Sequence, residues 1–282
     1  MKRRIPGFSA ALVGCCLALS AEATLAAASQ LDQQMIELAK RPTPKTADGR
    51  PDLRGIWFSY TGSNSGFVQT KLPDGSLVAS LPQSVQAGPS PFAPTKDPPQ
   101  YKPEFQAKLK QIQSINMNKV DNVFICGQPG LPRVGAPQQI LQERDQVVFL
   151  YSDLNGMVFR VIPIGGKYRD TEPSYYGVGV GKWEGDTLVI DTRNFSTDTW
   201  IGEDGFFHSD QMRTTERLRR IGDTIEYKIT VEDPGVLTQP WVKPTYTMRK
   251  TDRPLEEPFR CDYTDLGGLA DDRRERHDQR VK

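Results

Sequence analysis

Short strand patterns separated by turn residues dominate the second half of this sequence and favour an all-β fold. Segments rich in β-branched and aromatic residues cover 139–143, 146–152, 157–164, 175–183, 187–192, 213–220, 224–231 and 246–250. With a strand at 53–59, they predict an antiparallel barrel or sandwich of about 8–9 strands with a lipocalin-like pattern. Short helices at 31–41 and 104–115 and a Pro-rich, irregular stretch at 61–103 complete the expected fold.

The ends of the chain predict segments outside the barrel. Met1–Arg4 is basic, Phe8–Ser20 is apolar but too short to span a bilayer, and small residues follow, as in a secretory signal cleaved near Ala28. Residues 12–15 also resemble a lipobox, so a lipid anchor on Cys15 is the alternative to an unanchored periplasmic or secreted protein. No later stretch reaches the roughly 18 apolar residues of a transmembrane helix. We expect a signal peptide at 1–28, an N-terminal segment at 29–118, a β-barrel domain at 119–265 and a charged, flexible tail at 266–282.

Two cysteines remain after removal of the signal peptide, Cys126 and Cys261. In an oxidising compartment two thiols distant in sequence pair, so we expect a disulfide between them, with two buried thiols as the alternative. The whole chain has a formal net charge of +1, which gives no electrostatic reason to expect a nucleic-acid partner. The oligomeric state stays open.

A row of glycines interrupts the strand at 175–183. Gly177, Gly179 and Gly181 leave one side of this strand without side chains, and glycine inside a strand marks close packing or a close approach of a ligand. A two-residue loop at 184–185 places Gly181 opposite Leu188. The bare strip is then either covered by neighbouring core side chains or forms the floor of a ligand pocket.

The hairpin at 213–231 places one carboxylate on an apolar face. A two-residue loop at 222–223 pairs Ile221 with Thr224, and counting back sets Glu216 opposite Ile229. A carboxylate on a buried face needs a partner or a raised pKa. An arginine such as Arg160 is the expected partner in a structural ion pair, and an acid/base site is the alternative.

The familiar signatures of cofactor and metal chemistry are missing from the sequence. The run Gly177–Lys182 has the wrong spacing for a phosphate-binding loop, and with only His208 and His277 an ordinary zinc site lacks ligands. We expect neither a cofactor nor a metal.

His208 is the side chain best suited to proton transfer near neutral pH. Glu216 and Asp233 are the other catalytic candidates, although His208 and Glu216 would lie roughly 26 Å apart on a continuous strand and cannot form a contacting pair. Trp200 lies in a polar, glycine-containing loop and is a candidate ligand contact. The candidate ligand-binding residues are Gly177, Gly179, Gly181, Leu188, Trp200 and Tyr227.

Several motifs between residues 120 and 265 resemble one family of sequences. They are Trp183–Thr192 (WEGDTLVIDT), Phe195, Trp200, His208–Ser209, Glu216–Arg217, Asp233–Pro234, Pro240–Trp241 and Cys261. Together they resemble a broad group of uncharacterised exported bacterial proteins, which implies export and transfers no activity. Residues 262–265 depart from the His-Glu-containing stretch of that group. The similarity to lipocalin-like barrels is an analogy of fold alone.

These features favour a periplasmic β-barrel protein that binds a small apolar or aromatic molecule. The alternative is a cofactor-independent acid/base enzyme (a lyase, isomerase or hydrolase) that acts on such a molecule. A third interpretation is an envelope interaction protein with residues 61–103 as its contact surface.

Overall fold

The computed structural model describes residues 34–60, 68–71, 77–80, 97–114, 121–125, 127–153, 156–202, 205–243 and 245–255. The predicted signal peptide, the predicted tail and both Cys126 and Cys261 lie outside these residues. The predictions of export and of a disulfide therefore stay predictions.

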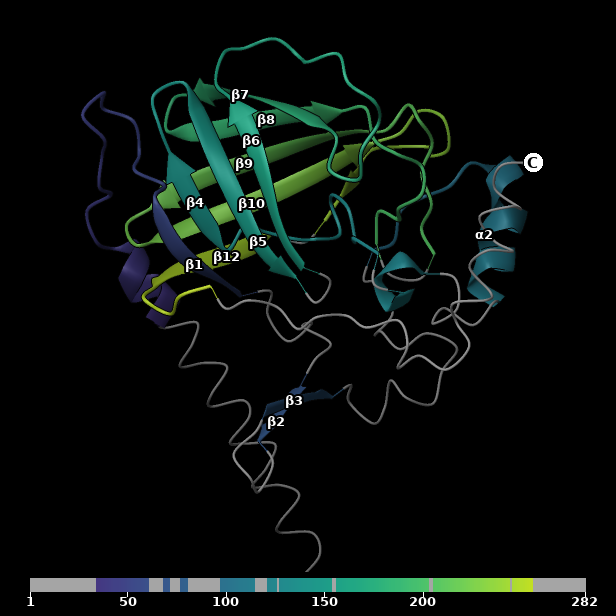
Figure 1. Ribbon diagram of the computed structural model, residues 1–282, viewed down its shortest axis with the longest axis horizontal. Coiled ribbons are helices and arrows are strands. Elements are labelled where there is room, and N and C mark those ends of the chain that lie inside the picture. Colours follow the sequence, from purple (N-terminus) through teal and green to yellow (C-terminus); the bar gives the residue numbers. More distant parts are fainter. Residues whose placement is uncertain are drawn as a thin grey trace, which may run out of the picture.

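Antiparallel strands form a nearly closed barrel, which confirms the expected fold class (Figure 1). Nine strands follow one another in the order β6-β5-β4-β1-β12-β10-β9-β8-β7, and β11 pairs with β10 beside this path. A parallel bridge between Ile164 and Gly181 joins the two ends of the sheet. The strands of the barrel are β1 (Gly55–Tyr60), β4 (Gln139–Gln142), β5 (Gln146–Asp153), β6 (Gly156–Pro163), β7 (Val178–Glu184), β8 (Thr187–Arg193), β9 (Arg213–Ile221), β10 (Thr224–Glu232), β11 (Trp241–Val242) and β12 (Tyr246–Thr251).

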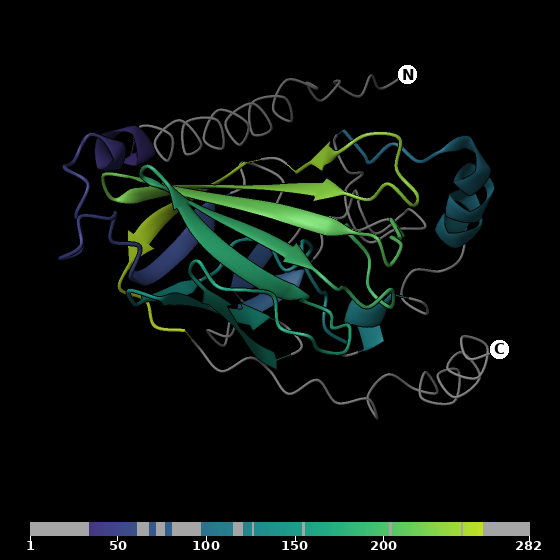
Figure 2. The same ribbon diagram turned by 90° about the horizontal axis from the view of Figure 1, so that it is seen from above.

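The first strand belongs to the barrel, although the sequence places it in the N-terminal segment. β1 pairs with β12 along its length and with β4 at its start. The other N-terminal elements are peripheral. Residues 34–39 are helical and lie at the opposite end of the sheet from the 3-10 turn η2 (Pro103–Phe105) and helix α2 (Gln106–Ser114) (Figure 2). A further 3-10 turn, η3, covers Asn122–Ile125. Among the described residues no helix is long and apolar enough to cross a bilayer.

The Pro-rich stretch is not wholly irregular, contrary to the sequence prediction. β2 (Val68–Lys71) and β3 (Leu77–Ser80) pair as a separate two-stranded antiparallel sheet. The five residues that connect them, 72–76, include Pro73, Asp74 and Gly75, which are residue types typical of turns.

The β9–β10 hairpin has the predicted register, with Ile221 opposite Thr224 and Glu216 opposite Ile229. Burial alternates along both strands: most charged side chains face outward and apolar side chains face the interior, whereas Glu216 and Arg220 of β9 are buried. The inward side chains of the barrel form one core cluster, which includes Trp57, Phe149, Ile162, Ile190, Leu218 and Met248.

The predicted register of the β7–β8 hairpin is wrong by two residues. Glu184 pairs with Thr187, so the loop is 185–186 and Gly181 lies opposite Ile190. Gly185 has a φ of +58°, a conformation that strains any residue with a side chain, so glycine takes the first loop position. Because the shift is two residues, every side chain keeps its predicted face.

Candidate functional site

A buried ion pair between Arg160 and Glu216 confirms the predicted partner of Glu216. Arg160 donates two hydrogen bonds to the carboxylate, at 2.9 Å and 2.6 Å, and the two residues are 6% and 0% exposed. Tyr227 also donates to Glu216 at 2.9 Å, and burial together with the charge of Glu216 raises the pKa of Tyr227 well above its ordinary value. Arg160 donates further to the hydroxyls of Tyr151 and Thr192. The structure thus gives Glu216 a structural ion pair.

Side chains cover the glycine strip. A Cβ placed on Gly179 would lie 3.5 Å from a guanidinium nitrogen of Arg160, and one on Gly181 would lie 2.7 Å from Ile164 Cδ1. Gly177 has a φ of +61°, and a Cβ there would lie 2.6 Å from the carbonyl oxygen of Arg193. Close packing therefore accounts for the glycines.

His208 is buried and its ring nitrogens are both hydrogen-bonded. Nδ1 lies 2.9 Å from the carbonyl oxygen of Ser209 and Nε2 lies 3.1 Å from the hydroxyl of Thr199. Because a carbonyl only accepts, Nδ1 carries the proton and Nε2 accepts from Thr199. Burial lowers the pKa of His208, against the opposing effects of its bond to Ser209 and of the charges of Asp233 and Asp198.

This buried, neutral histidine makes stability depend on pH. The unfolded chain binds a proton at His208 near the ordinary pKa of 6.5, and the folded chain binds it only at lower pH. The free energy of unfolding therefore falls as the pH drops through about 6.5, and His208→Gln should remove this part of the slope. Urea denaturation between about pH 7.5 and pH 5.5 measures it. His277→Gln, at the other histidine of the chain, is the control, and an unchanged slope in His208→Gln would contradict the prediction.

Asp233 holds the loop that follows β10 rather than contacting His208. Its carboxylate accepts from the backbone N–H and the hydroxyl of Ser209, both at 2.6 Å, and from the N–H of Gly235 at 3.0 Å. His208 and Asp233 thus both bond to Ser209 without bonding to each other, and Glu216 bonds to Arg160 and Tyr227 instead.

Two of the candidate ligand contacts pack into the core. Leu188 is fully buried. Trp200 is half-buried, forms a bridge with Phe207 and packs against the core cluster. Neither residue lines the groove described next.

A groove of about 920 Å³ lies at the rim of the barrel, where β7 and β9 begin and β8 and β10 end. Its apolar wall includes Val178, Met212 and Leu237, which are 6%, 1% and 3% exposed. Pro234 and Pro240 extend this wall. We call it the rim groove.

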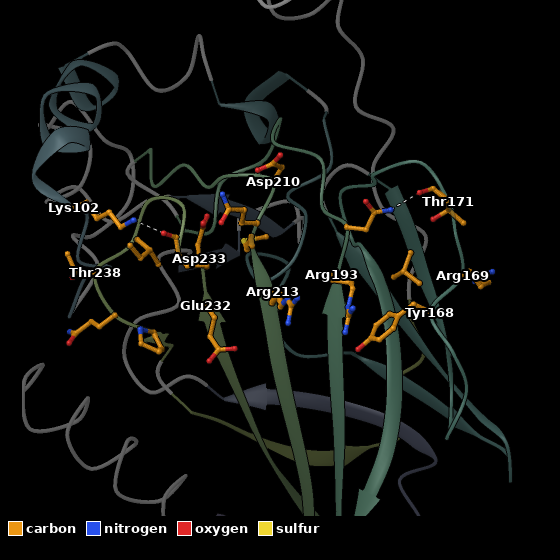
Figure 3. Close-up of a pocket in the computed structure, with 18 of the residues that line it drawn as sticks. Lys102, Tyr168, Arg169, Thr171, Arg193, Asp210, Arg213, Glu232, Asp233 and Thr238 are labelled. Atoms are coloured by element: carbon orange, nitrogen blue, oxygen red, sulfur yellow. Dashed lines mark hydrogen bonds between the residues drawn. The ribbon is translucent and has the colours of Figure 1, made fainter.

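Charged side chains line the rim groove (Figure 3). Arg193 and Arg213 lie at the ends of neighbouring strands, with Tyr168 beside Arg193, and Lys102 lies on the opposite side. Lys102 donates to the carbonyl oxygen of Pro234 at 2.6 Å. Within the described part of the chain, no group of three or more His, Cys, Asp or Glu side chains is placed to hold a metal ion.

Sequence reasoning missed most of this groove. Of the candidate site residues, only Asp233 lines it. The alternation of side chains along the strands predicts that Arg193 and Arg213 face outward. Charged side chains on such a face are most often simply solvated, so this pattern alone does not indicate a site. Their convergence depends on segments far apart in the sequence.

No protein-family model matches the chain, and no curated protein is similar enough to count as a relative. By its architecture the described part of the chain is a nearly closed antiparallel β-barrel with a core cluster of buried side chains and a groove at one rim.

Proposed function

We propose that this protein is an exported β-barrel protein that binds a small molecule with an apolar or aromatic body in the rim groove. One observation carries the proposal: a groove of about 920 Å³ joins a buried apolar wall to charged ends. Ligand sites in proteins have volumes of about 300–1,000 Å³ and the same mixture of apolar walls with a few polar groups. The signal-like N-terminus supports a periplasmic or secreted location.

The rim is a better place for the ligand than the glycine strip. Arg160 and Ile164 already occupy the space above Gly179 and Gly181. The hydrogen bonds of His208, Glu216 and Asp233 are directed to other protein groups. The proposal is therefore binding, with the groove wall as the contact surface.

Filling the rim groove should abolish binding. Gln239 is exposed on the groove wall, and Gln239→Trp should weaken binding of the neutral aromatic probe 2-naphthamide at least about tenfold, because the indole takes its place on the apolar wall. Isothermal titration calorimetry measures the affinity. Lys228→Trp, on the outer face of β10 outside the groove, is the matched control.

Native mass spectrometry of the protein isolated from the periplasm supplies the second measurement. A retained small molecule that Gln239→Trp releases and Lys228→Trp keeps would support the proposal. Unchanged retention and unchanged probe affinity in Gln239→Trp would contradict it.

A further inference from the structure

Two arginines stand next to each other on the wall of the rim groove. Arg193 ends β8 and Arg213 begins β9, one position beyond the Thr192–Thr214 pair of that ladder. Figure 3 shows both side chains running in the same direction from neighbouring strands. Like charges opposite each other on adjacent strands are destabilising. An anion bound between the two side chains would turn this repulsion into attraction of both arginines to the anion.

Arg193 is fixed in position while one of its donors has no acceptor. Its guanidinium lies 3.6 Å from the centroid of the Tyr168 ring, and the Tyr168 hydroxyl donates to Asp191. Arg193 also forms a long ion pair with Asp191, whose Oδ1 lies 3.7 Å from Arg193 Nη2, beyond hydrogen-bond distance. Nε of Arg193 is buried and has no hydrogen-bond partner among the described residues. Stacking uses only the face of the guanidinium, and the Arg193 side chain as a whole is 41% exposed. Its terminal N–H groups, rather than the buried Nε, are therefore available to an oxyanion.

Arg213 has fewer partners than Arg193. Glu232 lies opposite it across the β9–β10 ladder, yet Arg213 forms no ion pair with any of the described residues. Carboxylates also line the groove, namely Asp170, Asp210, Glu232 and Asp233. Arg193 and Arg213 nevertheless place two positive charges side by side at the ends of β8 and β9, next to the apolar wall.

We infer that the ligand of the rim groove carries an oxyanion, which Arg193 and Arg213 bind together while the apolar wall holds the body of the ligand. This inference deepens the proposed function and rests on it. A carboxylate and a phosphate offer the same oxygen acceptors to a guanidinium pair, so the choice between them is left to the experiment.

Three naphthalene probes test the inference: neutral 2-naphthamide, 2-naphthoate and 2-naphthyl phosphate. By isothermal titration calorimetry at low salt, at least one anionic probe should bind at least about tenfold more tightly than 2-naphthamide. This advantage should shrink as sodium chloride is added. The tighter of the two anionic probes identifies the oxyanion.

Substitution of either arginine should remove the advantage selectively. Arg193→Met and Arg213→Met should each weaken the favoured anionic probe at least about tenfold and change 2-naphthamide less than about twofold. Arg219→Met is the matched control for Arg213→Met, because Arg219 lies on the outer face of the same strand, opposite Glu226, and outside the groove. Thermal unfolding without ligand should show Arg213→Met to be about as stable as the original protein, because Arg213 lies between the like charge of Arg193 on β8 and the opposite charge of Glu232 on β10.

Failure of the oxyanion inference and failure of the proposed binding function give different results. If 2-naphthamide binds as tightly as both anionic probes, or if the arginine variants weaken all three probes equally, the inference on the oxyanion is wrong and the proposed function stands. If none of the three probes binds and no small molecule is retained by the periplasmic protein, both are wrong.

Discussion

Glu216→Ala should lower the free energy of unfolding by about 3–5 kcal/mol, which is the loss typical of removing one partner of a buried ion pair. The variant leaves the guanidinium of Arg160 buried without its carboxylate, and it removes the acceptor of Tyr227. The free energy of unfolding of an ordinary domain is about 5–15 kcal/mol in total. The expected loss is therefore a large fraction of the stability of the protein. Urea denaturation followed by tryptophan fluorescence measures the loss.

Two further variants separate the charge effect from simple loss of volume. Glu226→Ala removes an exposed carboxylate from the neighbouring strand and should change the free energy of unfolding by less than about 0.5 kcal/mol. The double variant Arg160→Met with Glu216→Leu removes both charges together and should recover most of the loss, since apolar replacement of a buried pair is often neutral or stabilising. A double variant as unstable as Glu216→Ala would show that the charge left unpaired is not the cause.

Gly222→Ala should destabilise the protein by about 2–5 kcal/mol, which combines about 1–2 kcal/mol for a left-handed backbone with about 1–3 kcal/mol for overpacking. Gly222 has a φ of +57°, and a Cβ there would lie 2.8 Å from the carbonyl oxygen of Arg41 and 2.9 Å from that of Ala39. The backbone of the N-terminal segment thus covers this loop, and Asp223 accepts a hydrogen bond from Arg41 at 2.9 Å.

Gly185→Ala is the matched control for this prediction. Gly185 begins the same Gly-Asp loop in the other hairpin with a φ of +58°, but a Cβ there would meet nothing within 4 Å. Gly185→Ala should therefore lower the free energy of unfolding only by the backbone contribution of about 1–2 kcal/mol. Equal losses in the two variants, measured by urea denaturation, would contradict the role of the N-terminal cover.

The local pattern of the sequence was enough for the β9–β10 hairpin and for the burial of Glu216. The loop at 222–223 pins the register of two strands that are adjacent in sequence, and side-chain alternation then assigns the faces. The β7–β8 hairpin shows the limit of this reasoning. The sequence predicts its glycine strip and the face on which each side chain lies. The choice between two neighbouring loop positions required the backbone conformation of Gly185.

The sequence by itself determined the all-β class and the hairpins, because alternation and turn chemistry act between residues close along the chain. The tertiary structure alone decided the rim groove. Arg193 and Arg213 become neighbours only through the pairing of β8 with β9 across the connection 194–212, and Tyr168 reaches Arg193 from the connection between β6 and β7. Such long-range registers depend on how the whole sheet closes and packs, which no short stretch of sequence specifies.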